Sequence, residues 1–442
     1  RYYSRYKVNN DQKNIAKLNG MFLIIFSIIG FTALLAGMVL VFYTDTIFGE
    51  KLTLKELSTA KILMAIMVIN IGLSFPNVVF NSYVTANEQF VFQKLLQMFK
   101  VIANPFLVLP VLLLGYGSIG MVIITTLLNI FIEIVNIVFC FKKLNMKISF
   151  KQFDFSLMKE MTIFSSFIFI NMIVDQINWN VDKFILGRFH GTVSVALYGL
   201  AAQLNNYYKT LSIAISNVFI PRINKLVATS NNDRELTLLF TKVGRVQFLV
   251  LSIVLIGFIF FGRPFINMWA GSNYDETYMI ALFLIVPVTF PLIQNIGIEI
   301  QRAKNMHQFR SWVYMFIAII NVIITVPLAK MYAGLGAAIG TAISLIFGNI
   351  FIMNWYYHKK IGLDMIYFWK QIFSFIPSLI LPIVLGNLMR LYVDLYNIKA
   401  FLLCGVIFVV IFLVSIWFLG MNQYEKDLIR KPILRFIRRV KR

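Results

Sequence analysis

Twelve apolar stretches, each long enough to cross a lipid bilayer, follow one another along this chain of 442 residues. A transmembrane helix needs about 20 mostly apolar residues, and a window of that size finds every stretch. The connections between the stretches are short and leave no room for a soluble catalytic domain. We therefore predict an all-α polytopic membrane protein. The predicted spans lie near 20–43, 60–84, 91–114, 117–141, 160–186, 193–219, 243–268, 278–301, 309–328, 333–357, 368–391 and 398–420.

The composition excludes the common soluble classes. Hydrophobic residues make up 59% of the chain and charged residues 14%, whereas a soluble domain carries about a quarter charged residues. The formal charge is +22, and a basic excess on so apolar a chain suits a membrane and not a nucleic acid. Cys140 and Cys404 both lie in apolar stretches, and the three histidines are far apart, so neither a disulfide framework nor a metal site is indicated.

Basic residues alternate between the connections, which predicts the orientation of the chain. One set of connections carries 30 of the 41 Lys and Arg residues. Because positively charged loops stay on the cytoplasmic side, we expect this set, and with it both ends of the chain, to be cytoplasmic. The connections of the basic set are 1–19, 85–94, 142–159, 220–245, 301–310, 358–370 and 421–442.

The two halves of the chain repeat at an offset of 217 residues, which pairs Arg5 with Arg222. The first four spans correspond in order to the four spans between 243 and 357. The two spans between 160 and 219 have no counterpart in the first half. The chain also begins with Arg1 and not with Met, so we expect about 60 further residues, forming two helices, to precede it.

With those two helices the protein has fourteen, arranged as two pseudo-symmetric six-helix bundles and a C-terminal helix pair. Parallel repeats of this kind form transporters whose two halves enclose a central cavity. The predicted parts are an N-terminal lobe at 1–141 that lacks its first two helices, a cytoplasmic linker at 142–159, a C-terminal lobe at 160–357, the additional helix pair at 358–420 and a basic cytoplasmic tail at 421–442.

Polar side chains recur at steps of three and four within several spans, which places them on one face of each helix. Such faces predict either a hydrated cavity or hydrogen bonds between neighbouring helices, and the spacing alone leaves both open. The candidate cavity residues are Asn77, Asn81, Asn129, Asn171, Asn178, Gln203, Asn206 and Lys209.

Three carboxylates on these faces, Glu133, Asp175 and Asp182, are candidate functional residues. A charge facing lipid at mid-bilayer costs about 2.5 to 3.5 kcal/mol, so intramembrane acids usually face protein or water and have a function. Asp182 precedes Lys183 near the outer end of its predicted span, where extension of both side chains to the interface is an equal alternative.

The chain resembles the polysaccharide-transport branch of the multidrug, oligosaccharidyl-lipid and polysaccharide exporter superfamily, the O-antigen and exopolysaccharide flippases. The resemblance covers essentially the whole chain and departs from the family in the absent first helix pair. The residues that carry it are VDKFILG at 181–187, ALYG at 196–199, NVFIPRI at 217–223 and the glycine run at 334–340.

The resemblance implies that the protein moves an undecaprenyl-diphosphate-linked oligosaccharide across the cytoplasmic membrane by ion-coupled alternating access. It implies no enzyme activity and no cofactor beyond a proton or sodium gradient, and Glu133, Asp175 and Asp182 are then the candidates for coupling transport to that gradient. The implied partners are the lipid-linked glycan, membrane lipids and the polysaccharide polymerase and chain-length machinery, with no nucleic acid. The candidate ligands of the diphosphate, at the cytoplasmic mouths of paired helices, are Lys94, Lys100, Arg302 and Lys304.

Two other transporters fit the same pattern. A cation-coupled multidrug exporter of the superfamily shares the architecture, but its cavity favours apolar and acidic residues, whereas the candidate mouths here are basic. A lipid II flippase is a third candidate, which the sequence leaves open. A membrane-embedded glycan polymerase or ligase is disfavoured, because such an enzyme has a long outer loop and the outer loops here are short.

Overall fold

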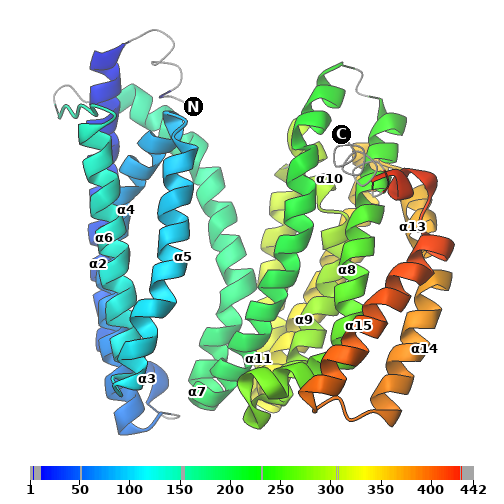
Figure 1. The fold of residues 1–442 in the computed structure, drawn as a ribbon. Helices are drawn as coiled ribbons and strands as arrows, with labels where there is room; N and C mark the ends of the chain where they lie inside the picture. The colour runs from blue at the N-terminus through cyan, green and yellow to red at the C-terminus, as the bar shows by residue number, and fades with distance from the viewer. Residues whose placement is uncertain are drawn as a thin grey trace, which may run out of the picture. The chain divides into compact units, whose positions relative to one another are not determined.

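The computed structural model describes residues 11–49, 52–150, 155–229, 232–304 and 308–428, together with Tyr3, Met306 and Arg430. Between 155 and 179 it describes the backbone and the side chains of Met158, Lys159 and Gln176 only, and it leaves out the side chains of 228 and 229. The described residues form helices and no strand, so the all-α prediction is confirmed (Figure 1). The chain divides into two compact units, unit 1 at 1–166 and unit 2 at 167–442.

Unit 1 is built on long antiparallel helices with short connections. α2 packs on α4, α4 packs on α6, and α5 packs on α6. The polar sequence around Thr53 starts α4, because Thr53 and Glu56 form a capping box that bonds two backbone N–H groups. The helices of unit 1 are α2 (Gln12–Phe42), α3 (Thr44–Phe48), α4 (Leu54–Ala86), α5 (Phe90–Leu113) and α6 (Gly117–Lys142).

Unit 2 contains most of the buried side chains. Its core brings together Leu186, Phe240, Ile280 and Phe368 from four different helices. The helices are α7 (Phe155–Thr229), which begins in unit 1, then α8 (Asp233–Ala270), η1 (Ser272–Tyr274), α9 (Glu276–Ile293), α10 (Ile296–Ala303), α11 (Gln308–Leu345), η2 (Ile346–Met353), α12 (Asn354–Tyr356), η3 (Tyr357–Ile361), α13 (Met365–Phe373), α14 (Ile376–Tyr392), α15 (Ile398–Ser415) and η4 (Ile416–Gly420).

Two helices of unit 2, α7 and α11, each consist of two helices that meet at a kink, and both kinks lie where the sequence predicts a connection between spans. α7 is interrupted at Gly191, whose φ of 77° is costly for any residue with a side chain. α11 is interrupted at Tyr332 and Ala333. Among the described residues nine helices are long and apolar enough to span a membrane, or ten if the bent pair α13 and α14 is one span. The multi-pass fold is therefore confirmed, but the number of twelve spans is not.

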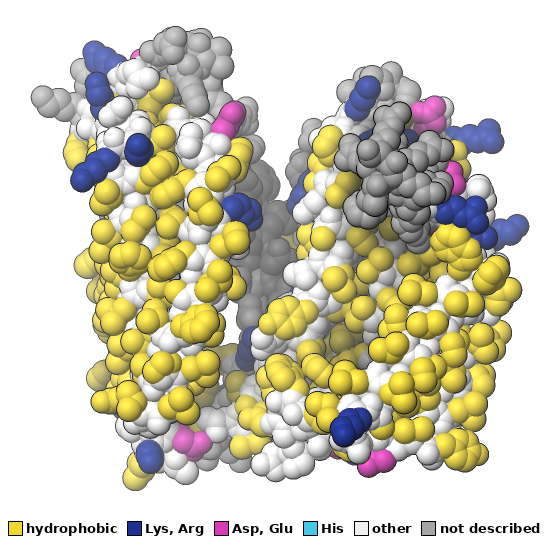
Figure 2. All heavy atoms as spheres, in the orientation of Figure 1, with side chains coloured by type: hydrophobic (Ala, Val, Ile, Leu, Met, Phe, Trp, Pro, Cys, Tyr) yellow, Lys and Arg dark blue, Asp and Glu magenta, His cyan; other side chains and the backbone are white. Residues whose placement is uncertain are grey.

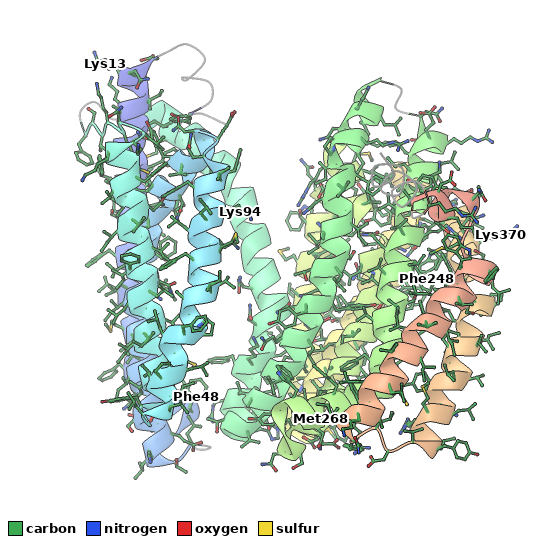
Figure 3. The ribbon with its side chains drawn as sticks, viewed as in Figure 1. Lys13, Phe48, Lys94, Phe248, Met268 and Lys370 are labelled. Carbon is green, nitrogen blue, oxygen red and sulfur yellow. The ribbon has the colours of Figure 1, made fainter. Side chains whose placement is uncertain are left out.

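Connections predicted to share one side of the membrane lie at the same end of unit 1. The backbone N–H of Ser149 donates to the carbonyl of Ala16 at 2.9 Å, and Asn19 donates to the carbonyl of Lys147 at 3.0 Å. Lys13 lies at this end and Phe48 at the other (Figure 3).

Unit 2 shows the same separation of its ends. Lys304, in the connection after α10, forms an ion pair with Asp233 and donates to the carbonyl of Ile361, which joins three connections of the basic set. Lys370 lies at this end and Met268 at the opposite one (Figure 3). On the face of each unit that Figure 2 shows, hydrophobic side chains cover the middle and most charged ones lie near the ends, as expected of a multi-pass membrane protein.

Candidate functional site

The most completely enclosed acid among the described residues is Asp182, in the first half of α7. Its side chain is 0% exposed, and its Oδ2 accepts hydrogen bonds from Tyr198, in the second half of α7, and from Thr341 of α11, the latter at 2.9 Å. Asp182 therefore does not extend to the membrane interface, and that interpretation of the sequence is wrong. Two hydroxyls hold the carboxylate instead.

Further oxygens continue this cluster along α11. Thr325 donates to Oδ1 of Asn321 at 2.8 Å, and Oγ1 of Thr341 lies 3.4 Å from the same oxygen. The halves of α11 approach closely because position 340 is glycine: a Cβ there would lie 2.4 Å from Oγ1 of Thr325. Asn321, Thr325 and Thr341 are all buried. We call Asp182, Tyr198, Asn321, Thr325 and Thr341 the Asp182 cluster.

The Asp182 cluster has the composition of a site for a small cation or a proton. Its side-chain oxygens come from one carboxylate, one amide and three hydroxyls, and the Oδ1 atom of Asp182 makes no hydrogen bond within the described residues. An unpartnered carboxylate oxygen in an apolar core is costly, and that cost falls when the oxygen is protonated or binds a cation.

Unit 1 holds a second, more open polar group between α4 and α6. Asn77 donates to Oε2 of Glu133 at 2.8 Å, and Asn136 donates to Oδ1 of Asn81 at 2.8 Å. Glu133 is half-buried, and the charge of Lys100 on α5 acts on it. These bonds agree with the interpretation in which the polar faces form hydrogen bonds between neighbouring helices. Asn81 is also exposed, so part of its face remains a polar surface.

The second half of α7 presents an exposed polar face. Gln203, Asn206, Tyr207 and Thr210 are all exposed, and their spacing of three, one and three residues places them on one side of the helix. Gln203 donates to the hydroxyl of Tyr207 at 2.9 Å. A helix of a membrane protein that keeps such a face exposed has it directed toward water or a polar ligand and not toward lipid.

The four candidate diphosphate ligands have different surroundings. Lys94 is exposed on α5 (Figure 3) and donates to Gln97 at 3.1 Å, and Lys100 is half-buried. Arg302 is exposed and pairs with Glu299 at 2.7 Å. Lys304 is largely buried in its pair with Asp233 at 2.6 Å, so its ammonium already neutralises a carboxylate.

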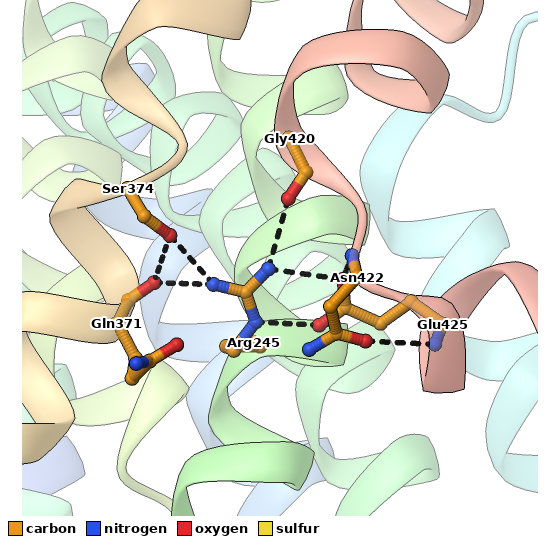
Figure 4. Close-up of polar contacts among 6 residues, drawn as sticks. All are labelled: Arg245, Gln371, Ser374, Gly420, Asn422 and Glu425. Carbon is orange, nitrogen blue, oxygen red and sulfur yellow. Dashed lines mark hydrogen bonds and ion pairs between the residues drawn. The ribbon is translucent and has the colours of Figure 1, made fainter.

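A buried ion pair ties the C-terminal helix pair to α8. Arg245 makes two hydrogen bonds to Glu425, at 2.6 and 3.0 Å, and both side chains are at most 4% exposed. The remaining guanidinium N–H groups donate to the carbonyl of Gln371, the hydroxyl of Ser374 and the carbonyl of Gly420 (Figure 4). All five N–H donors of the guanidinium are therefore used.

Comparison with known proteins assigns the chain to a family. Residues 21–279 match the family described as polysaccharide biosynthesis protein. The chain belongs to this family. No curated protein sequence matches it.

Solved structures show that this polysaccharide biosynthesis protein has the fold of flippases and transporters. The inward closed conformation of the lipid II flippase MurJ aligns with a TM-score of 0.73 and 18% identity, over 97% of this chain and 87% of that one. The bent form of the Vibrio cholerae MATE transporter VcmN aligns with a TM-score of 0.51 and 14% identity, over 82% of each chain. A mutant form of the same transporter gives 0.52 and 14%, over 81% and 83%.

The structure of this family member brings some predicted residues together and not others. Asn77 and Glu133 meet directly, whereas Asn129 has a buried Oδ1 atom without a hydrogen bond in the described part of the chain. Lys209 is half-buried on α7. The side chains of three predicted residues, Asn171, Asp175 and Asn178, lie outside the described ones.

The sequence did not indicate the partners of Asp182 or of Arg245. Tyr198 and Thr341 are neutral residues within apolar helices, and their spacing shows no polar stripe that includes Asp182. Arg245 was counted only among the basic residues of a cytoplasmic connection. The one available signal was Glu425, an acid within a strongly basic C-terminal segment.

Proposed function

We propose that this polysaccharide biosynthesis protein moves undecaprenyl-diphosphate-linked oligosaccharide repeat units from the cytoplasmic to the outer leaflet of the bacterial cytoplasmic membrane, for surface polysaccharide synthesis. The family match over residues 21–279 carries the proposal. The fold supports it, because two of the similar structures are those of a lipid II flippase and a MATE transporter.

In this proposal the glycan binds the exposed polar faces of the helices as it crosses the membrane. Gln203, Asn206 and Tyr207 provide exposed amides and a hydroxyl, which suit the many hydroxyl groups of a sugar. The diphosphate binds basic groups near one end of each unit, where Lys94 and Arg302 are exposed. Lys304 contributes less, because binding a phosphate would require it to leave Asp233.

Transport is coupled to a proton or sodium gradient at the Asp182 cluster. This assignment rests on the full burial of Asp182, on its Oδ1 atom, which makes no hydrogen bond with a described residue, and on Thr341, whose hydroxyl contacts both Oδ2 of Asp182 and Oδ1 of Asn321. An ion bound there neutralises the carboxylate and crosslinks α7 to α11, so occupancy and helix packing depend on each other. Glu133 is the second candidate, and Asp175 is retained from the sequence.

A lipid II flippase is the second candidate function. The alignment with MurJ over 97% of this chain favours it, and lipid II would use the same polar and basic surfaces. The MATE alignments, with lower scores, leave a cation-coupled drug exporter as the weaker candidate. In each case both ends of the chain are cytoplasmic. In the glycan-flippase proposal the product is delivered to polymerase and chain-length machinery at the outer leaflet.

Deletion of the full-length gene in its native host separates these functions. The glycan-flippase proposal predicts accumulation of lipid-linked oligosaccharide in the inner leaflet, inaccessible to an external glycosidase, with relief by the intact gene. Accumulation of lipid II with normal surface polysaccharide would instead identify a lipid II flippase. Normal export of both glycans together with new sensitivity to cationic drugs would overturn the proposal in favour of a drug exporter.

A further inference from the structure

Three basic side chains stack on two aromatic rings at the end of unit 2 that carries the C-terminal segment. Lys426 and Arg430 lie over the ring of Trp417, at 6.0 and 5.3 Å from its centroid, and Lys242 of α8 lies 5.0 Å from that of Tyr424. Such cation–π contacts hold the charged groups over ring faces. We call these five residues the basic–aromatic surface.

A buried ion pair and two backbone hydrogen bonds fix the position of this surface. Tyr424 and Lys426 flank Glu425, which is held by Arg245 as described above. Asn422 and Glu425 also bond each other's backbone N–H groups, at 2.9 and 3.0 Å, which starts the helical turns over 423–428. Lys242 lies one turn before Arg245 on α8. The cations therefore project from a clamped junction of α8 and the C-terminal segment, and not from a free tail.

The surroundings of the surface match the boundary between lipid tails and headgroups. Phe418 is 73% exposed, Leu419 60% and Leu428 46%, so apolar side chains adjoin the cations on the same segment. None of Lys242, Lys426 and Arg430 forms an ion pair with another described residue. Trp and Tyr side chains are typical of this depth in a membrane, and long basic side chains extend from it toward the headgroups.

We propose that the basic–aromatic surface binds the headgroup of an anionic phospholipid. The phosphate lies among the three cations, and the acyl chains lie along the exposed Phe418 and Leu419. The occupant is a lipid of the surrounding leaflet, because the surface combines net positive charge with neighbouring apolar side chains on the membrane-facing helix pair. The site is independent of the transported substrate.

Trp417 provides the reporter for a test on the full chain. The purified protein is reconstituted in vesicles that contain either brominated phosphatidylglycerol or brominated phosphatidylcholine, and quenching of tryptophan fluorescence is measured. Subtraction of a Trp417→Phe variant isolates the emission of Trp417 from that of the other five tryptophans. The test variant carries Lys242→Gln, Lys426→Gln and Arg430→Gln. The matched control carries Lys359→Gln, Lys360→Gln and Lys370→Gln, which removes three exposed charges near the same end of unit 2.

The proposal predicts that phosphatidylglycerol quenches Trp417 at about fivefold lower mole fraction than phosphatidylcholine, and that only the test variant loses this preference. Equal quenching by the two lipids would overturn it. An equal loss in the control would also overturn it, because it would reduce the effect to general surface charge. Displacement of the brominated lipid by equimolar undecaprenyl diphosphate would assign the surface to the substrate instead.

Discussion

The intramembrane acids of the two units have different surroundings. In unit 2, Asp182 is completely buried, and two hydroxyls bind one of its oxygens. In unit 1, Glu133 is half-buried, one amide binds it, and the charge of Lys100 acts on it. An acid that exchanges freely with water needs no further partner, whereas a fully enclosed one needs a proton or a cation. This difference favours Asp182 for ion coupling.

The internal repeat sharpens the comparison. Asn104 and Asn321 are 217 residues apart, the offset at which the halves repeat, and each lies beside a threonine hydroxyl. Thr125 is 3.3 Å from Asn104, and Thr341 is 3.4 Å from Asn321. Only Thr341 also bonds a carboxylate among the described residues; Thr125 donates instead to the carbonyl of Met121. The amide therefore repeats at this offset, whereas the two threonines are 216 residues apart and resemble each other only in their contact with the amide. Asp182 makes the pair in unit 2 a charged site.

The largest expected effect is on stability. It compares removal of a buried charge in unit 2 with removal of an exposed charge in unit 1. Arg245→Ala leaves Glu425 buried without its partner, and the loss of a buried partner costs about 3–5 kcal/mol. Lys61→Ala breaks an exposed pair with Asp45 and is expected to cost less than about 1 kcal/mol. Thermal unfolding in a single detergent measures both. Similar melting temperatures for the two variants would contradict the contrast drawn between the units.

The next effect separates the two acids in function. We expect Asp182→Asn to lower ion-driven transport about 100-fold, because the enclosed cluster loses its charged ligand. Glu133→Gln should retain activity within about threefold, since the amide of glutamine keeps the bond partner of Asn77. Transport by reconstituted protein under an imposed proton or sodium gradient measures both. A greater loss in Glu133→Gln would move the coupling site to unit 1.

The sequence predicts the fold class well because its signal is local. Each span is a run of apolar residues, and each polar face is a spacing of three and four within one helix. The interruptions at Gly191 and at Tyr332 and Ala333 fall at two of the connections that the sequence predicts, and at each of them two helices meet across a kink. The count of nine or ten candidate spans among the described residues treats each interrupted helix as one span, so it does not confirm the predicted number of twelve.

The candidate site could be predicted only in part, because its contacts join residues that are far apart in the sequence. Asp182 stands out as an acid in an apolar span. Its partner Thr341 is 159 residues further along the chain, and many other residues with a hydroxyl group also lie in apolar helices. Arg245 and Glu425 are 180 residues apart. A count of basic residues assigns Arg245 to the membrane surface, whereas packing of the C-terminal helix pair buries it. Such long-range pairs require the tertiary structure.

A smaller effect compares the contact between an amide and a hydroxyl in each of the two units. Thr341→Val removes a hydrogen bond to the carboxylate of Asp182, and we expect about a tenfold increase in the ion concentration that gives half-maximal transport. Thr125→Val removes the matching hydroxyl of unit 1, where no carboxylate among the described residues bonds it, and should change this concentration by less than about twofold. Equal shifts in the two variants would show that both units contribute to ion binding.

The smallest expected effect concerns the exposed ion pair between Arg263 and Asp275 at the opposite end of unit 2 from Arg245. Hydrogen bonds from Arg263 hold the pKa of Asp275 below its ordinary value of 3.8. The pair therefore contributes its full stability above that value, and the contribution disappears as the pH falls through the lowered pKa. Because both side chains are at least one-third exposed, Asp275→Asn should cost less than about 1 kcal/mol at pH 7. The melting temperatures of the variant and the parent should converge once the pH has fallen below the lowered pKa of Asp275. A difference that persists there would mean that Asp275 stabilises the start of α9 through contacts that do not depend on its charge.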